Sequence, residues 1–298
     1  MITTLKLRAY GKINLALDVL RKREDGYHDV RMIMQTVGIY DQVDLRRKEE
    51  PGITVETNLS YLPVNENNLV YQAARLLMEE FQVKEGLHIQ LKKFLPVAAG
   101  MAGGSSDAAA VLYGVNKMFG LGLSKEALME RGVKIGADVP YCLLRGTALS
   151  EGIGEKLTPL PPMPQCQVVI AKPGISVSTR YVYENLHANE LKEEQHPDID
   201  GILEALRRQD LKGMAECMRN GNVLETVTVP AHPVIQKIKD TMESQGALAA
   251  LMSGSGPTVF GIFEDRNKAR RAMALLRKSR LAKQLFLTTP YNNRREKP

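Results

Sequence analysis

The sequence predicts an α+β protein of two domains. A chain of 298 residues is long for a single hydrophobic core. Strand-like alternation and helix-like spacing of apolar residues both recur along it. The segment "TPLPPMP", residues 158–164, interrupts these patterns, because proline suits neither a helix interior nor an inner strand. We therefore predict one domain over residues 1–160, a second over 161–291, and a polar tail over 292–298.

The amino-terminal domain is predicted to mix strands and helices. In "KINLALDV", residues 12–19, apolar side chains alternate with Lys12, Asn14 and Asp18, so Lys12 and Asn14 share one face of a strand. Further strands are expected at 29–37, 40–47 and 87–96. Helices are expected at 68–81, from the glycine-rich stretch to about 119, and at 124–136, where Ser124 is a natural cap.

The carboxy-terminal half has the pattern of a small antiparallel α+β sandwich. "QCQVVIA" is typical of a strand, and "LAALMSGSGPTVFGIFE" of two strands joined by a glycine turn. A last strand is expected at "QLFLTTP". Helices are expected at 179–186, 199–207, 211–219, 234–245 and from 266 onward.

Composition and charge favour a packed cytoplasmic protein with a small-molecule ligand. Of the residues, 44% are hydrophobic and 25% charged, and no apolar run is long enough to cross a bilayer. The amino terminus lacks the features of a signal peptide. The net charge is +6, yet the basic stretch from Arg266 has apolar residues at helical spacing, which indicates a solvated helix face rather than a nucleic-acid site. Cys142, Cys166 and Cys217 form no Cys-x-x-Cys pair, so no metal site is expected.

The most informative stretch is "PVAAGMAGGSSDAAA", a glycine-rich loop that leads directly into a helix. The first amides of a helix lack internal acceptors, and glycines let backbone nitrogens approach phosphate oxygens. The loop therefore predicts a phosphate cradle; the alternative is a strand-to-helix turn with small residues for close packing. It lacks the lysine of a P-loop and the spacing of a dinucleotide fingerprint.

Three segments together resemble the motifs of the GHMP kinases, which phosphorylate small molecules. They are "YGKINLALDVLRKREDGYHDV", the glycine-rich loop, and "LMSGSGPTVFGIF". The segments "GKINLALDVLRKREDGYHD" and "GADVPYCLLRGTALSEGIGE" narrow the resemblance to the members that phosphorylate the 2-hydroxyl of diphosphocytidyl methylerythritol in the non-mevalonate isoprenoid pathway. Two differences are that Met101 replaces a common leucine and Ala102 a common glycine.

This resemblance implies a two-domain GHMP kinase fold, with a mixed sheet and helices followed by a ferredoxin-like domain. It also implies ATP as donor, accompanied by Mg²⁺. The adenine pocket would be bordered by residues 65–69. The residues that the resemblance assigns to ATP are Asn65, Asn68, Pro96, Val97, Ala98, Ala99, Gly100, Met101, Ala102, Gly103, Gly104, Ser105 and Ser106.

The resemblance also implies the catalytic and acceptor-binding residues. Asp138 would be the catalytic carboxylate, either as a base or as an electrostatic orienter, and Lys12 its cation. Without the family, these two would be interpreted as a turn residue and an exposed strand lysine. For the acceptor the resemblance assigns Asn14, Tyr27 and His28 and, more loosely, Thr179 and Tyr183, for which helix packing is an equal alternative.

Two rival functions remain at this stage. Another GHMP kinase, such as homoserine kinase, would share the donor chemistry and differ in its acceptor. A nucleic-acid-binding protein would make use of the basic charge and would have no use for the glycine loop. We expect a monomer or homodimer with no nucleic-acid or membrane partner.

Overall fold

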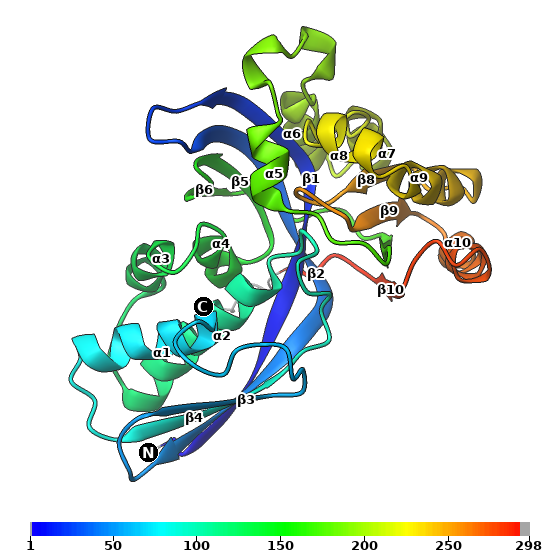
Figure 1. The fold of residues 1–298 in the computed structure, drawn as a ribbon. Helices are drawn as coiled ribbons and strands as arrows, with labels where there is room; N and C mark the ends of the chain where they lie inside the picture. Colours follow the sequence, from blue (N-terminus) through cyan, green and yellow to red (C-terminus); the bar gives the residue numbers. More distant parts are fainter. Residues whose placement is uncertain (1, 293–298) are drawn as a thin grey trace. The chain divides into compact units, whose positions relative to one another are not determined.

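A computed structural model describes residues 2–292, which form two compact units (Figure 1). The first comprises 2–11, 39–97 and 102–144; the second comprises 12–38, 98–101 and 145–292. Two long strands, β1 (Thr4–Lys22) and β2 (His28–Lys48), contribute residues to both units. The α+β class is confirmed, while the division at residue 160 stays a prediction. Of the predicted tail, only Asn292 lies within the described residues.

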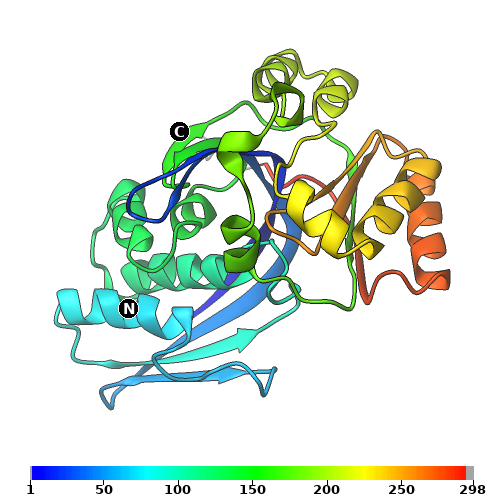
Figure 2. The ribbon, with the colours of Figure 1, turned by 45° about the horizontal axis from the view of Figure 1, so that its top comes forward.

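The first unit places helices beside a sheet. β4 (Gly86–Lys92) pairs antiparallel with β2, so that Leu91 lies opposite Val43, and parallel with β3 (Ile53–Thr57). The helices are α1 (Leu69–Glu80), α2 (Gly103–Phe119), α3 (Lys125–Val133) and α4 (Val139–Leu144). Helices α1 and α2 pack side by side in both views (Figures 1 and 2). Gly114 of α2 lies against the sheet, where a Cβ would stand 2.3 Å from Leu45 Cδ1 of β2, so the missing side chain lets the helix approach the strands closely.

The second unit contains the predicted antiparallel sheet. Its strands lie in the order β10 (Gln284–Thr288), β7 (Gln167–Lys172), β9 (Val259–Phe263) and β8 (Ala249–Met252). Helices α9 (Val234–Ser244) and α10 (Arg266–Lys278) pack against these strands. The remaining α-helices of the unit are α5 (Thr179–Glu184), α6 (Ile199–Arg208), α7 (Leu211–Cys217) and α8 (Glu225–Ala231). Short 3₁₀ turns occupy Ala188–Glu190 and Glu193–Gln195.

Two further strands extend the second unit at the predicted proline-rich linker. β5 (Thr147–Gly152) pairs with the first part of β2, and β6 (Lys156–Pro159) pairs with β5. β6 is an edge strand, which tolerates Pro159 at its end. The linker prediction was therefore wrong for residues 158–159, because an edge strand does not need every backbone donor.

Strand β2 is continuous where the sequence pattern predicts two strands. The interruption falls at Gly38, whose backbone N–H donates to Thr289 O at 3.0 Å. A Cβ at this position would lie 2.9 Å from Thr288 Oγ1. The glycine thus marks a close approach of two chain segments and not a break. Strand β3 and helix α4 were not predicted, because segments of five and six residues are too short to show a clear period.

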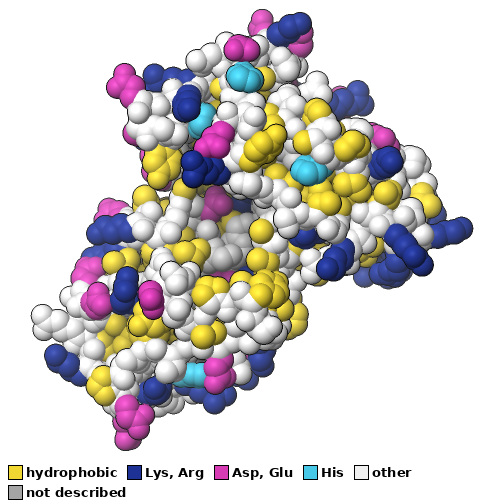
Figure 3. Space-filling model, in the orientation of Figure 1, with side chains coloured by type: hydrophobic (Ala, Val, Ile, Leu, Met, Phe, Trp, Pro, Cys, Tyr) yellow, Lys and Arg dark blue, Asp and Glu magenta, His cyan; other side chains and the backbone are white. Residues whose placement is uncertain are grey.

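The basic stretch from Arg266 forms the solvated helix that was predicted. Asp265 caps α10, and the helix buries Ala269, Ala272 and Leu276. Lys and Arg side chains gather over α10 at the right of the molecule in Figure 3. No helix in the described part of the chain is long and apolar enough to cross a membrane.

Candidate active site

The glycine-rich loop delivers uncapped amides to the start of α2. Ala102 stands at the N-cap with φ of 54°, and its side chain caps nothing. Gly103 begins the helix and Gly104 is exposed. Because the first amides of a helix have no internal acceptor and carry partial positive charge, this terminus can bind an anion.

Two alanines of the loop hold a backbone conformation that L-residues rarely adopt. Ala98 has φ of 50° and Ala102 has φ of 54°. Each such residue costs about 1–2 kcal/mol, so the surrounding structure must hold the loop in place. Ala102, which stands where the related kinases commonly have a glycine, is therefore a position at which glycine would be unstrained.

The two serines of the loop differ in their surroundings. Ser106 is buried, and its hydroxyl donates to the carbonyl of Tyr10 at 2.6 Å. Ser105 is only half-buried. The hydroxyl of Ser106 therefore anchors α2 to β1, whereas the Ser105 hydroxyl has no hydrogen-bond partner among residues 2–292.

The start of α1 lies next to the start of α2. Leu69 Cδ1 is 3.4 Å from the place where a Cβ on Gly104 would stand. The Asn68 side chain accepts from Val70 N at 3.1 Å and donates to Pro63 O at 2.7 Å, so it is engaged as the N-cap of α1. Asn65 accepts from Asn67 N. The side chains of Asn65 and Asn68 therefore bond to backbone groups and hold the conformation of the segment that is predicted to border the adenine pocket.

Asp138 immediately precedes α4, and its carbonyl accepts from Cys142 N at 3.0 Å. The side chain is half-buried, and its carboxylate has no hydrogen-bond or ion-pair partner among residues 2–292. A carboxylate at the start of a helix is favoured by the helix dipole. Asp138 is therefore oriented by backbone structure and remains available to a ligand.

In the second unit, Lys12 and Asn14 lie on one face of β1, as their spacing predicts. Lys12 is 5% exposed and is therefore not the exposed strand lysine of the alternative interpretation. Its Nζ donates to Asn14 Oδ1 at 2.6 Å and to Gly100 O at 3.0 Å. An ammonium has three donors, so one N–H is left for a ligand. The Asn14 amide also contacts Met32 Sδ at 3.3 Å.

A close backbone contact holds the carbonyl that Lys12 uses. Gly100 O also accepts from Ser253 Oγ at 2.9 Å. A Cβ on Gly100 would lie 2.0 Å from Ser253 O, and one on Gly254 would lie 3.3 Å from the Gly100 Cα. The turn at Gly254 therefore lies against the glycine-rich loop at Gly100.

The residues that hold this turn were not predicted from the sequence. Ser253 is fully buried, and buried Asn222 donates from Nδ2 to Met252 O at 2.8 Å and to Gly254 O at 2.9 Å. Neither residue has a periodic signal. The one available hint is the position of Ser253 directly before the glycine turn.

Of the side chains predicted to bind the acceptor, Tyr183 packs against His28. The His28 ring centroid lies 5.1 Å from that of Tyr183, with the planes tilted by 48°. His28 Nε2 is buried and has no hydrogen-bond partner among the described residues. A buried polar atom without a partner is costly unless a ligand completes it. Tyr27, 59% exposed, offers an open aromatic surface next in the chain.

Burial is the main cause that lowers the pKa of His28 below its usual value, and the charge of Lys22 adds to it. The ring is therefore neutral at neutral pH, with one nitrogen donating and the other accepting. Thr179, exposed at the start of α5, shares a hydrogen bond of 2.7 Å with Ser255 Oγ, which ties α5 to the glycine turn.

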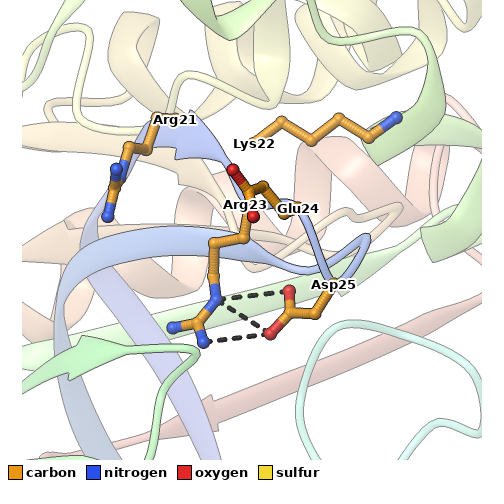
Figure 4. A pocket seen from close by; sticks show the side chains of 5 residues that line it. All are labelled: Arg21, Lys22, Arg23, Glu24 and Asp25. Atoms are coloured by element: carbon orange, nitrogen blue, oxygen red, sulfur yellow. Dashed lines mark hydrogen bonds and ion pairs between the residues drawn. The ribbon is translucent and has the colours of Figure 1, made fainter.

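The turn between β1 and β2 borders a hollow of about 550 Å³ lined by residues 21–25 (Figure 4). Arg23 is held by Asp25 and Asp29, and Arg21 by Asp29. Lys22 has no hydrogen-bond or ion-pair partner within residues 2–292. The hollow therefore offers an available cation for an anionic group.

No group of three or more His, Cys, Asp or Glu side chains within residues 2–292 could hold a metal ion.

Comparison with known proteins identifies the class. Residues 68–146 match the GHMP kinases N terminal domain, and residues 202–279 match the GHMP kinases C terminal domain. The chain is also similar to curated proteins and to a solved structure over nearly its whole length.

A protein of Lachnoclostridium phytofermentans named 4-diphosphocytidyl-2-C-methyl-D-erythritol kinase is 57% identical over 95% of this chain and 96% of its own. A protein of the same name from Lachnospira eligens is 54% identical over 97% and 99%. A crystal structure of 4-(cytidine 5'-diphospho)-2C-methyl-D-erythritol kinase matches 97% of this chain and 100% of its own, with 30% identity and a TM-score of 0.78. The chain belongs to the GHMP kinases and, within them, to the 4-diphosphocytidyl-2-C-methyl-D-erythritol kinase family.

Replacing Gly100 with alanine should lower the free energy of unfolding by about 3–5 kcal/mol, because a Cβ adds a collision with Ser253 O to the strain of a positive φ. Gly120→Ala is the matched control. Gly120 has a similar φ of 65° and nothing within 4 Å of its Cβ position, so its cost should be about 1–2 kcal/mol. Urea unfolding measures both, and equal losses would mean that the close contact is unimportant.

His28 should titrate below its usual value of 6.5, because burial and Lys22 both disfavour the charged ring. As the pH falls through 6.5, the ring should therefore remain mostly neutral. Histidine-selective NMR over pH 5–8 would measure the pKa, with His28→Gln assigning the signal. A pKa at or above 6.5 would contradict the neutral, half-buried ring.

Proposed function

We propose that the chain transfers the γ-phosphoryl group of ATP to the 2-hydroxyl of 4-diphosphocytidyl-2-C-methyl-D-erythritol, in the non-mevalonate pathway to isoprenoid precursors. The observation that carries this acceptor is the buried His28 Nε2 without a partner, beside the ring of Tyr183. Such an atom suits the polar edge of a base. The name shared by relatives up to 57% identical supports the same acceptor.

The proposed donor site is the glycine-rich loop and the start of α2. The uncapped amides after Ala102 and the hydroxyl of Ser105 suit the ATP phosphates. The start of α1, beside Gly104, suits the border of the adenine pocket. Mg²⁺ would arrive with the triphosphate and neutralise part of its charge.

In the proposed reaction the acceptor oxygen forms a bond to the γ-phosphorus while the bond to the β–γ bridging oxygen breaks, which releases ADP. Asp138 has an available carboxylate that can take the hydroxyl proton or orient the hydroxyl. Lys12 has one unused donor that can stabilise the charge on the transferring group. Neither residue has to form a covalent bond to the substrate, because catalysis of phosphoryl transfer depends chiefly on positioning the reactants and stabilising charge.

The proposed acceptor site uses two aromatic surfaces and the histidine. Exposed Tyr27 can stack on the cytosine ring, His28 can read its edge, and Tyr183 can form the opposite wall. We propose that Asn14 and Thr179 also contact the acceptor substrate. Because the base is far from the reacting hydroxyl, its binding would serve to position that hydroxyl. We also propose that the protein acts in the cytoplasm, as a monomer or homodimer, without nucleic-acid or membrane partners.

The catalytic roles predict that Asp138→Asn removes nearly all turnover and that Lys12→Ala does the same, because each removes a charge that acts in the transition state. ATP affinity should change little. Coupled ADP release and calorimetric ATP binding would measure the two effects. Turnover of Asp138→Asn close to that of the parent protein would require another catalytic carboxylate.

The acceptor site predicts that methylerythritol 4-phosphate, which lacks the cytidyl group, is a very poor acceptor. Tyr27→Ala should weaken use of the full acceptor by about 1–3 kcal/mol in kcat/KM, the usual range for base stacking. The KM for ATP should barely change. Homoserine and mevalonate, tested alongside, separate this acceptor from those of other GHMP kinases. Equal kcat/KM with and without the cytidyl group would refute the cytidine site.

A further inference from the structure

Three charged side chains of the first unit form a buried cluster that the proposed reaction does not use. Lys93 Nζ donates to Asp107 Oδ2 at 2.6 Å and also to Asp41 Oδ2. All three residues are buried. Buried charges are costly unless they are paired and hydrogen-bonded, so such a cluster needs a reason beyond ordinary packing.

The cluster joins the two ends of the glycine-rich loop. Lys93 directly follows β4, and Asp107 lies in the second turn of α2, so the whole loop lies between them. Asp41 Oδ1 accepts from the backbone amides of Phe94 at 2.5 Å and Leu95 at 2.7 Å. The cluster therefore holds the residues that enter the loop and the helix that leaves it.

The ammonium also lies close under the first residue of α2. A Cβ on Gly103 would stand 3.2 Å from Lys93 Nζ and 3.7 Å from Asp41 Oδ2. A shift of Lys93 would thus displace the amides that are proposed to bind phosphate. The loop between the two ends holds Ala98 and Ala102 at positive φ, which persists only when the surroundings determine it.

The electrostatics suit a cluster beneath an anion site. Burial raises the pKa of Asp107 well above its usual value, against the opposing effect of the Lys93 ammonium. Burial alone would lower the pKa of Lys93, but the carboxylates of Asp107 and Asp41 outweigh it and raise that pKa. Lys93 therefore keeps its charge and stays paired with both carboxyl groups. Asp107 Oδ1 is buried without a hydrogen-bond partner among the described residues, so Lys93 is its carboxyl group's main contact.

We propose that Lys93, Asp41 and Asp107 are positioning residues that clamp the glycine-rich loop in the conformation that binds ATP. They touch no substrate themselves and act through the backbone of residues 94–95 and 103. This proposal rests on the proposed function, because it takes the loop to be the ATP phosphate site.

The test compares Asp107→Leu with Asp107→Asn, two variants of similar size that both leave Lys93 paired with Asp41. Asparagine keeps an oxygen that can accept from Lys93, whereas leucine has none. The KM for ATP should rise about tenfold in Asp107→Leu, as expected for a lost bond to a charged group, and stay within about twofold in Asp107→Asn. The kcat and the KM for the acceptor should change much less.

Asp44→Leu is the matched control. Asp44 is a buried carboxylate on β2, the strand that also carries Asp41. It accepts a hydrogen bond from Gln42 at 2.9 Å and lies outside the cluster. Its replacement should leave the KM for ATP unchanged. Thermal unfolding of each variant would set an assay temperature at which all are folded, so that loss of stability cannot imitate a change in KM.

Three results would overturn the clamp: an unchanged KM for ATP in Asp107→Leu, an equal rise in Asp107→Asn, or an equal rise in Asp44→Leu. If Asp107→Leu does not fold, the double variant Lys93→Met and Asp107→Leu removes the pair without leaving an isolated ammonium, and an unchanged KM there would likewise overturn it. Failure of the proposed function is distinct, because the parent protein itself would then show no ATP-dependent transfer to the diphosphocytidyl acceptor.

Discussion

The close passage of Gly100 against Ser253 and Gly254 is the constraint on which the second unit's part of the site depends. A hydrogen atom is all that fits at this position, since a Cβ would stand 2.0 Å from a carbonyl oxygen. The contact presents the carbonyl of Gly100 to Lys12, and that bond keeps a buried ammonium at a definite place. Burying an ammonium is costly unless acceptors satisfy it, and the Gly100 carbonyl is one of the two acceptors of Lys12.

The loop that carries Gly100 combines strain with strong anchors. Alanines at positive φ cost free energy, and burial of Ala99 and Met101 offsets part of that cost. The bonds from Lys12 and Ser253 to Gly100 hold its middle, and the Lys93 cluster holds its ends. A loop fixed in this way presents its amides without first having to order itself, which would reduce the entropic cost of the nucleotide binding that we propose for it.

Much of the site could be predicted because local patterns determine it. Alternation placed Lys12 and Asn14 on one face, and the glycine run next to an alanine-rich segment predicted the start of α2. Asn222, Ser253 and Lys93 were missed, because each acts through a partner between 14 and 153 residues away in the chain. Spacing along a sequence contains no information about such partners, and polar residues near turns are usually solvated.

By itself the sequence determined the α+β class and the family resemblance, and it predicted a phosphate-binding loop, since these follow from hydrophobic period, motifs and helix-start chemistry within short segments. Tertiary structure alone decided which side chains are available. The side chains of Ser106 and Asn68 are used in hydrogen bonds to the carbonyls of Tyr10 and Pro63. The Asp138 carboxylate and His28 Nε2 have no hydrogen-bond partner among the described residues. The physical reason is that a hydrogen bond needs a donor and an acceptor within about 3 Å, and only the packed chain brings distant groups that close.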